Sequence, residues 1–482
     1  MNQGTVVAGI SLTGVETLRS SVGGATGTIA FTTSSLNTIR VDGDNAEGGV
    51  LTLIAPGSVA TINYIGDGLA ANVNAQEQFK GLTITGAYNG TADAVAITLS
   101  NAGTTNLNGY GVGAITANGV ETVAITVTQA DVAATAAFAG ITSNTLQSVT
   151  FTSPSAVTAT IDATPVAGNS ALTSVNLSAV TGTVGSTITL ANGAVGAATQ
   201  VIGSTGTGGT TLNTNVQAAG DIVLFTGGQG NDTINAFVVG GNAFAGILQA
   251  SMGAGTNAVN VGDQAAGGTA STSIITLSGT GSVNTITGGS AADTITVTAN
   301  GLGSTNVVIG AAGDDVINAA ASTVAITLNG GAGADVITGG SGVDTYGQAS
   351  NFSVQGQSVA STANTLTAGG IVATNTVTFG NGVDRVTNFV SGVDKLDVAT
   401  AATAPTTLIG VTTGAALTNN TTYVLYGSYN TATNLFTAAA AYGAGTTDAV
   451  VVTGNGAATA VNTTGIVVLT GLNQALVAAD FI

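Results

Sequence analysis

The chain of 482 residues contains no cysteine, no histidine and no tryptophan. Without cysteine it forms neither disulfides nor thiolate metal sites, which excludes a disulfide-stapled scaffold. Without histidine it cannot use a Ser-His-Asp triad or a histidine-ligated zinc centre. Catalysis would have to rely on carboxylates, tyrosine, lysine or serine alone. We therefore expect that the protein is not an enzyme.

Charged side chains are also scarce, at 6% of the chain against about a quarter in a typical soluble domain. The basic residues are scattered and form no patch that could neutralise phosphates, which argues against nucleic-acid binding. They are Arg19, Arg40, Lys80, Arg385 and Lys395. The 23 acidic residues give a net charge of −18, which suits either solubility or the binding of cations.

Export and membrane signals are missing as well. The first residues show no basic segment followed by an apolar one, so no N-terminal signal peptide is expected. No run approaches the 18 or more apolar residues of a membrane span. An export signal would have to lie elsewhere in the protein.

Glycine is abundant, with 72 copies, and threonine, valine and isoleucine alternate along the chain. This composition favours β-strands separated by many turns. Short apolar-x-x-apolar phrases, such as those at 120–123, 146–149 and 172–175, recur at several spacings of 21 to 26 residues. This is about one coil of a β-solenoid, although a sandwich of short strands would look similar. Only two short helices are expected, at 130–138 and 472–481.

From about residue 226 the pattern G-G-x-G-x-D-x-U-x appears, where U is a large apolar residue. Strong copies alternate with weak copies that carry asparagine at the aspartate position, as in Asn284 and Asn306. Two nonapeptides make one turn of a parallel β-roll, so the strong copies should stack on one side and the weak ones on the other. The four strong copies begin at Gly227, Gly288, Gly310 and Gly330, and a fifth nonapeptide follows without a gap from Gly339.

The nonapeptide has the chemistry of a calcium site. Its glycines allow backbone conformations that turn carbonyl oxygens inward, and its aspartate adds a hard anionic oxygen. Oxygens from two successive turns can supply the six to eight ligands that Ca²⁺ prefers. The candidate metal-binding residues are Gly228, Gly230, Asp232, Gly289, Asp293, Gly310, Gly313, Asp315, Gly331, Gly333, Asp335, Gly340, Gly342 and Asp344.

Other acidic residues are weaker candidates. Asp42, Asp44 and Glu47 could hold a further calcium ion, although a solvated turn is the simpler explanation. Three acids further along the chain are interpreted as surface residues rather than ligands. They are Asp384, Asp394 and Asp397.

Residues 227–347 resemble the repeat-in-toxin (RTX) calcium repeats. Residues 377–397 look like the segment that follows such repeats in type I secreted proteins, and the final Ala-Ala-Asp-Phe-Ile resembles their uncleaved secretion signals. The Ala/Thr/Gly/Asn-rich first half is similar to S-layer proteins of Gram-negative bacteria. The resemblance implies passage through type I secretion machinery, a place on the cell surface, a calcium-held lattice of copies and attachment to lipopolysaccharide.

We therefore predict an all-β fold, a parallel β-solenoid or RTX β-roll followed by a β-rich C-terminal module. The predicted parts are a solenoid-like region at 1–225, the calcium-binding β-roll at 226–347, and a domain with the secretion signal at 348–482. The predicted cofactor is Ca²⁺.

The predicted function is a calcium-dependent, self-assembling surface coat. An alternative is an RTX-type adhesin or an ice- or surface-binding protein, which would present regular Thr-x-Thr rows on one side; such rows look irregular here. An RTX enzyme would need a cluster of carboxylate, tyrosine and basic residues, and none is visible in the sequence.

Overall fold

The computed structural model describes most of the chain, and it divides into two compact units, Met1–Ala258 and Val259–Ile482. The division falls inside strand β23 (Thr256–Val261). The three-part division expected from the sequence stays a prediction. The described residues are 6–12, 17–20, 26–34, 36–42, 49–54, 59–66, 77–86, 88–101, 107–128, 130–163, 172–191, 195–214, 221–236, 246–262, 270–347, 359–360, 376–379, 383–398, 405–407, 418, 421–443, 445–453 and 466–482.

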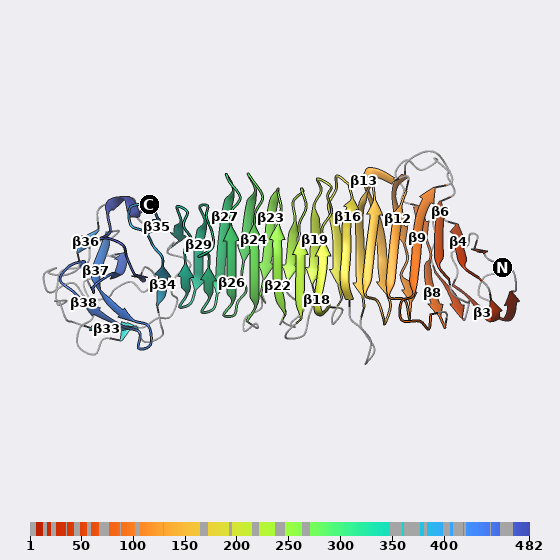
Figure 1. Cartoon of the computed structure of the whole chain (residues 1–482), viewed down its shortest axis with the longest axis horizontal. Helices are drawn as coiled ribbons and strands as arrows, with labels where there is room; N and C mark the ends of the chain where they lie inside the picture. The colour runs from red at the N-terminus through yellow and green to blue at the C-terminus, as the bar shows by residue number, and fades with distance from the viewer. Residues whose placement is uncertain are drawn as a thin grey trace. The chain divides into compact units, whose positions relative to one another are not determined.

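The first unit consists of two parallel sheets, and the chain alternates between them (Figure 1). One sheet contains β1 (Val6–Leu12), β3 (Gly27–Ser34), β5 (Val50–Ile54), β7 (Glu77–Phe79), β8 (Gly81–Thr85), β10 (Leu107–Val112), β11 (Ile115–Ala117), β13 (Ala130–Thr142), β15 (Ala156–Asp162), β17 (Ser186–Leu190), β19 (Thr210–Thr214) and β21 (Thr233–Ala236). The other contains β2 (Thr17–Ser20), β4 (Thr38–Asp42), β6 (Thr61–Gly66), β9 (Ala94–Asn101), β12 (Thr122–Val127), β14 (Ser148–Ser153), β16 (Leu172–Val180), β18 (Val195–Ile202), β20 (Ile222–Thr226) and β22 (Ile247–Met252).

The recurring apolar phrases explain this solenoid. Val123 of β12 pairs in register with Val149 of β14, and Val149 pairs with Val175 of β16. All three side chains are buried, so each coil stacks its apolar residues on those of the next. Complete burial of one such side chain stabilises the fold by about 1.5–3 kcal/mol. The predicted β-solenoid is confirmed.

The two predicted helices are wrong. Residues 130–138 lie in β13, which pairs in parallel with β10 and β15. An alanine-rich segment of this length is only marginally helical by itself, and the strands on both sides offer it a complete set of hydrogen bonds. Of the second predicted helix, only the 3-10 turn η1 (Ala478–Asp480) is present.

The second unit begins with the same two-sheet arrangement. One sheet runs through β24 (Thr272–Leu277), β26 (Thr294–Ala299), β28 (Val316–Asn318), β30 (Val336–Thr338), β34 (Asp384–Thr387) and β40 (Ile466–Thr470). The other runs through β25 (Val283–Thr287), β27 (Thr305–Ala312), β29 (Thr327–Ala332), β31 (Thr345–Gly347) and β35 (Lys395–Asp397). We call this part the roll; all of its strand pairs are parallel.

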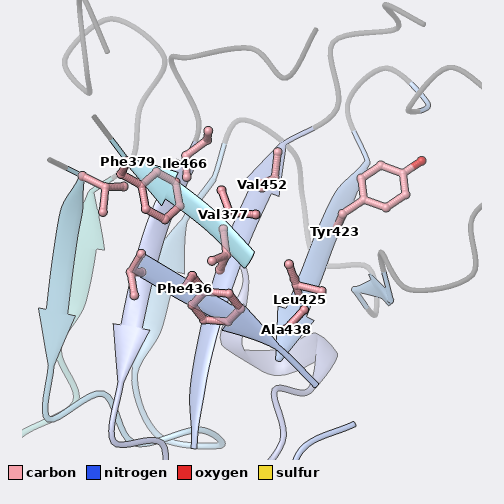
Figure 2. Close-up of a cluster of buried hydrophobic side chains, with 11 residues drawn as sticks. Val377, Phe379, Tyr423, Leu425, Phe436, Ala438, Val452 and Ile466 are labelled. Atoms are coloured by element: carbon pink, nitrogen blue, oxygen red, sulfur yellow. The ribbon is translucent and has the colours of Figure 1, made fainter. Parts of the chain in front are cut away.

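The rest of the second unit is a sheet that shares β40 with the roll and whose described strand pairs are antiparallel except for β36 with β37; we call it the antiparallel sheet. Its core is an apolar cluster of buried side chains that includes Phe379, Phe436 and Leu425 (Figure 2). Among the described residues, no helix is long and apolar enough to cross a membrane. The remaining strands of the antiparallel sheet are β32 (Val359–Ala360), β33 (Thr376–Phe379), β36 (Thr406–Thr407), β37 (Thr422–Asn430), β38 (Leu435–Ala438) and β39 (Asp448–Thr453).

Candidate metal centre

One edge of the roll carries a row of aspartates, one from each coil. Asp293, Asp315 and Asp335 each stand directly before a strand, and these strands are adjacent and in register. The backbone N–H of Asp293 donates to Oδ1 of Asp315 at 2.7 Å, and that of Asp315 donates to Oδ1 of Asp335 at 2.8 Å. Asp335 in turn donates to Oδ1 of Asp384 at 3.1 Å. We call these four residues the first row.

The second carboxylate oxygen, Oδ2, is the atom of this row that is available to a ligand. Oδ2 of Asp315 and Oδ2 of Asp335 are buried and have no hydrogen-bond partner among the described residues. An unpaired buried charge is costly unless a cation compensates it. These two oxygens are therefore placed to receive a ligand.

The raised pKa values of the first row show that its carboxylates are unfavourable in the charged form when no cation is bound. Burial raises the pKa of Asp315 to about 7, against the lowering effect of the N–H from Asp293. Burial likewise raises the pKa of Asp335 to about 7, and the carboxylate of Asp384 adds to this shift. A cation between the carboxylates would reverse both effects.

The first glycine of each repeat leaves the space for such an ion. A Cβ on Gly310 would overlap both Oδ2 of Asp315 and the carbonyl oxygen of Gly330 in the next coil. Carboxylate and carbonyl oxygens thus converge on a cradle that only glycine keeps open. No three carboxylates of the described residues gather closely enough to hold a metal ion by themselves, so carbonyl oxygens must complete the set. An all-oxygen set fits Ca²⁺.

The other predicted glycines shape the loops in two ways. Gly228, Gly289 and Gly340 donate their backbone N–H to Oδ2 of the aspartate four residues later. A second set lets the backbone of one loop lie directly on that of the preceding one, because a Cβ there would clash with its backbone atoms. This set comprises Gly230, Gly313, Gly331, Gly333 and Gly342; Gly313, Gly331 and Gly333 also have positive φ.

The opposite edge of the roll carries the weak copies, which we call the second row. Asn284 and Asn306 are paired in register, and the side-chain amide of Asn284 donates to Oδ1 of Asn306 at 2.8 Å. Ile326 takes the next position, and Asp344 follows it, with its Oδ1 accepting the N–H of Ile326 at 3.3 Å. Burial raises the pKa of Asp344 to about 6. The aspartate of the fifth repeat therefore stands in the row of the asparagines.

Asp232 belongs to the first unit and stands directly before β21. Its Oδ1 accepts the N–H of Thr210 and its Oδ2 that of Gly228, at 2.8 and 2.9 Å. Its own N–H donates to the side chain of Asn257. Asp232 is thus connected to the loops before and after it by the same kinds of hydrogen bond as Asp293 in the roll.

Comparison with protein families identifies these loops. A model of the RTX calcium-binding nonapeptide repeat matches residues 209–236, 276–297, 298–322 and 327–346. The chain carries RTX calcium-binding repeats. Comparisons with curated proteins and with solved structures give no match. Because the RTX nonapeptide binds calcium, the predicted cofactor Ca²⁺ is confirmed, and the cradles described above are the places in the chain that fit it.

Among the weaker acidic candidates, Asp42 is described by the structure, and its surroundings differ from those of the calcium loops. Both carboxylate oxygens of Asp42 accept hydrogen bonds from guanidinium groups, one from Arg19 and one from Arg40. Two positive charges on one carboxylate compete with calcium. Asp44 and Glu47 lie outside the described residues.

The interpretation of three later acids as surface residues is corrected for two of them. Asp384 and Asp394 are 3% and 1% exposed. Asp384 continues the first row, and Asp394 continues the second by accepting the N–H of Asp344 at 3.0 Å. Asp397 is exposed, as predicted. The missed signal is the pattern G-x-G-x-D-x-U-x at residues 380–387, which lacks only the first glycine of the repeat.

Ala311 offers a test of the glycine requirement. It has φ of 85°, although its side chain disfavours the left-handed region, and the equivalent Gly331 has φ of 103°. We expect Ala311→Gly to stabilise the roll by about 1 kcal/mol through the relief of this strain. Lower calcium concentrations should then suffice for half-folding in a titration followed by circular dichroism.

Ala291→Gly is the matched control, because the backbone at Ala291 does not adopt a positive φ. Glycine there should only increase the freedom of the unfolded chain and destabilise the roll slightly. Equal effects of the two substitutions would contradict the assignment of strain to Ala311.

Proposed function

We propose that the protein is a secreted RTX-type protein of the bacterial cell surface, where it assembles with copies of itself into a calcium-dependent coat, or S-layer. In this proposal the role is mechanical and protective rather than enzymatic. Type I secretion machinery would export the chain, and lipopolysaccharide would be its attachment point on the cell.

The burial of many acidic residues is the observation that best supports the proposal. Although the chain has 23 acidic residues, ten of them are buried in its described part. Five of the ten lie in the matched calcium repeats, where bound cations would offset their charge; they are Asp232, Asp293, Asp315, Asp335 and Asp344. The outer surface is therefore far less negative than −18 suggests. Weak net repulsion lets copies of one protein pack closely.

Exposed apolar side chains on the roll also support assembly with other copies. Leu302, in a turn before β27, is 71% exposed, and Val283 at the start of β25 is 44% exposed. Gly281 donates its N–H to the carbonyl of Leu302, so the two turns lie side by side. Adjacent exposed apolar groups are a common feature of surfaces that contact another protein.

A second candidate, binding to ice or another flat surface, is supported by one array in the first unit. Four successive strands align Thr158, Thr187, Thr211 and Thr233 across the sheet. Two residues further along the same strands stand Thr160, Thr189, Asn213 and Asn235. All eight side chains alternate with buried ones and face outward. The line of four threonines is regular, but Thr-x-Thr pairs stand on only two of the four strands, because β19 and β21 carry asparagine at the second position.

Electron microscopy of the purified protein separates the two candidates. We expect ordered sheets or filaments at millimolar calcium and their loss in chelator, because assembly requires folded loops. The variant D315N/D335N should fail to assemble, whereas D397N, which removes an exposed charge nearby, should assemble normally. A monodisperse monomer at high calcium would contradict the coat, and growth inhibition of ice crystals by that monomer would support the second candidate.

A further inference from the structure

We propose that Asp384 is a calcium ligand and that Asp335 and Asp384 together form a calcium site beyond the four matched repeats. The last matched segment ends at residue 346, so Asp384 lies outside it. The proposal rests on calcium binding by the repeats and is independent of the coat function.

The register of the strands brings the two carboxylates together. Strand β34 pairs in parallel with β30, and Val336 lies opposite Arg385. The preceding residues, Asp335 and Asp384, are therefore neighbours across 49 residues of sequence, and the N–H of Asp335 donates to Oδ1 of Asp384 at 3.1 Å. Asp315 and Asp335 have the same relation one coil earlier.

A second observation points to a cation at this place. Oδ2 of Asp335 is buried without a hydrogen-bond partner among the described residues. Asp384, which lies directly beside it, is itself only 3% exposed. A buried carboxylate pair in which one oxygen, Oδ2 of Asp335, has no hydrogen-bond partner in the described part of the chain is stabilised by a positive charge bound beside it.

The site would join two kinds of structure within the second unit. Strand β34 lies between β30 of the roll and β40, and β40 pairs in turn with β39 of the antiparallel sheet. An ion held by Asp335 and Asp384 therefore ties the last coil of repeats to the strand that begins the antiparallel part. Calcium would then control the folding of both parts. In the second row both carboxylate oxygens of Asp394 accept backbone N–H groups, and no ligand role is assigned to it.

Calcium stoichiometry tests the assignment on the full chain. Equilibrium dialysis with radioactive calcium should show one bound ion fewer, or one site weakened at least tenfold, in D384N relative to the unchanged protein. D397N, thirteen residues later and exposed, is the control and should bind the full number. An unchanged number and affinity in D384N would overturn the proposal.

Crystals of the unchanged protein soaked in terbium give a second readout that does not depend on the folding of a variant. We expect an anomalous peak between Asp335 and Asp384, in addition to peaks at the loops of Asp293 and Asp315. Peaks at those loops without one beside Asp384 would refute the site while leaving calcium binding by the repeats intact.

Discussion

Chelation of calcium at neutral pH should unfold the roll of the second unit. The stacked carboxylates of the first row would then be left buried and mutually repulsive, with two oxygens unpaired. Far-ultraviolet circular dichroism should lose β signal in chelator and regain it when calcium is added. If each site binds with a dissociation constant of about 10⁻⁴–10⁻³ M, 1 mM calcium stabilises the fold by about 0.4–1.4 kcal/mol per site.

Magnesium is the matched control for this titration. Magnesium prefers a rigid octahedral shell and keeps several of its waters. The loops offer carbonyl and carboxylate oxygens from two coils, which suits the larger and more flexible shell of calcium. We expect little β signal at equal magnesium concentration. A spectrum that chelator leaves unchanged would contradict the role of these loops in folding.

Acidification should have opposite effects on the calcium-free and the calcium-bound protein. Because the folded-state pKa values of Asp315 and Asp335 are raised to about 7, protonation stabilises the calcium-free fold. This contribution is complete below the unfolded pKa of about 4 and is lost as pH rises through 7. In chelator, the β signal in circular dichroism should therefore be present at pH 5 and be lost as the pH rises through 7.

With calcium present the trend reverses, because protons compete with the ion for the same oxygens. Calcium affinity should increase by up to about tenfold per pH unit for each proton released, between pH 5 and pH 7. Isothermal titration calorimetry in buffers of different ionisation enthalpy measures these protons. D315N should release fewer of them; equal release by D315N and the unchanged protein would contradict the assignment of the shifted pKa.

The fold class could be predicted because the apolar phrases and the nonapeptides are local patterns. Each coil repeats within about 20 to 26 residues, so the period of the sequence directly predicts the stack of strands. Asn284 and Asn306 face each other as their shared position in the weak copies predicts. Likewise, the alternation of strong and weak copies predicts two edges of different chemistry.

The continuation of the rows could not be predicted in the same way. The local pattern at residues 380–387 marks the loop of Asp384, but Asp384 follows Asp335 by 49 residues, and this separation breaks the period that identified the other loops. The helix expected at 130–138 failed for a related reason: local propensity favoured it, but neighbouring strands decided its conformation. Contacts distant in sequence carry the information that a reading of local patterns lacks.

The spacing of the first row also determines how such a molecule can change its size. Asp293, Asp315 and Asp335 are separated by 22 and 20 residues, and each coil contacts only its neighbours. Duplication or deletion of one whole coil would preserve the inward and outward faces of every strand. The roll can therefore lengthen or shorten in fixed increments of about 4.8 Å, each with its own ion site, without the design of a new core.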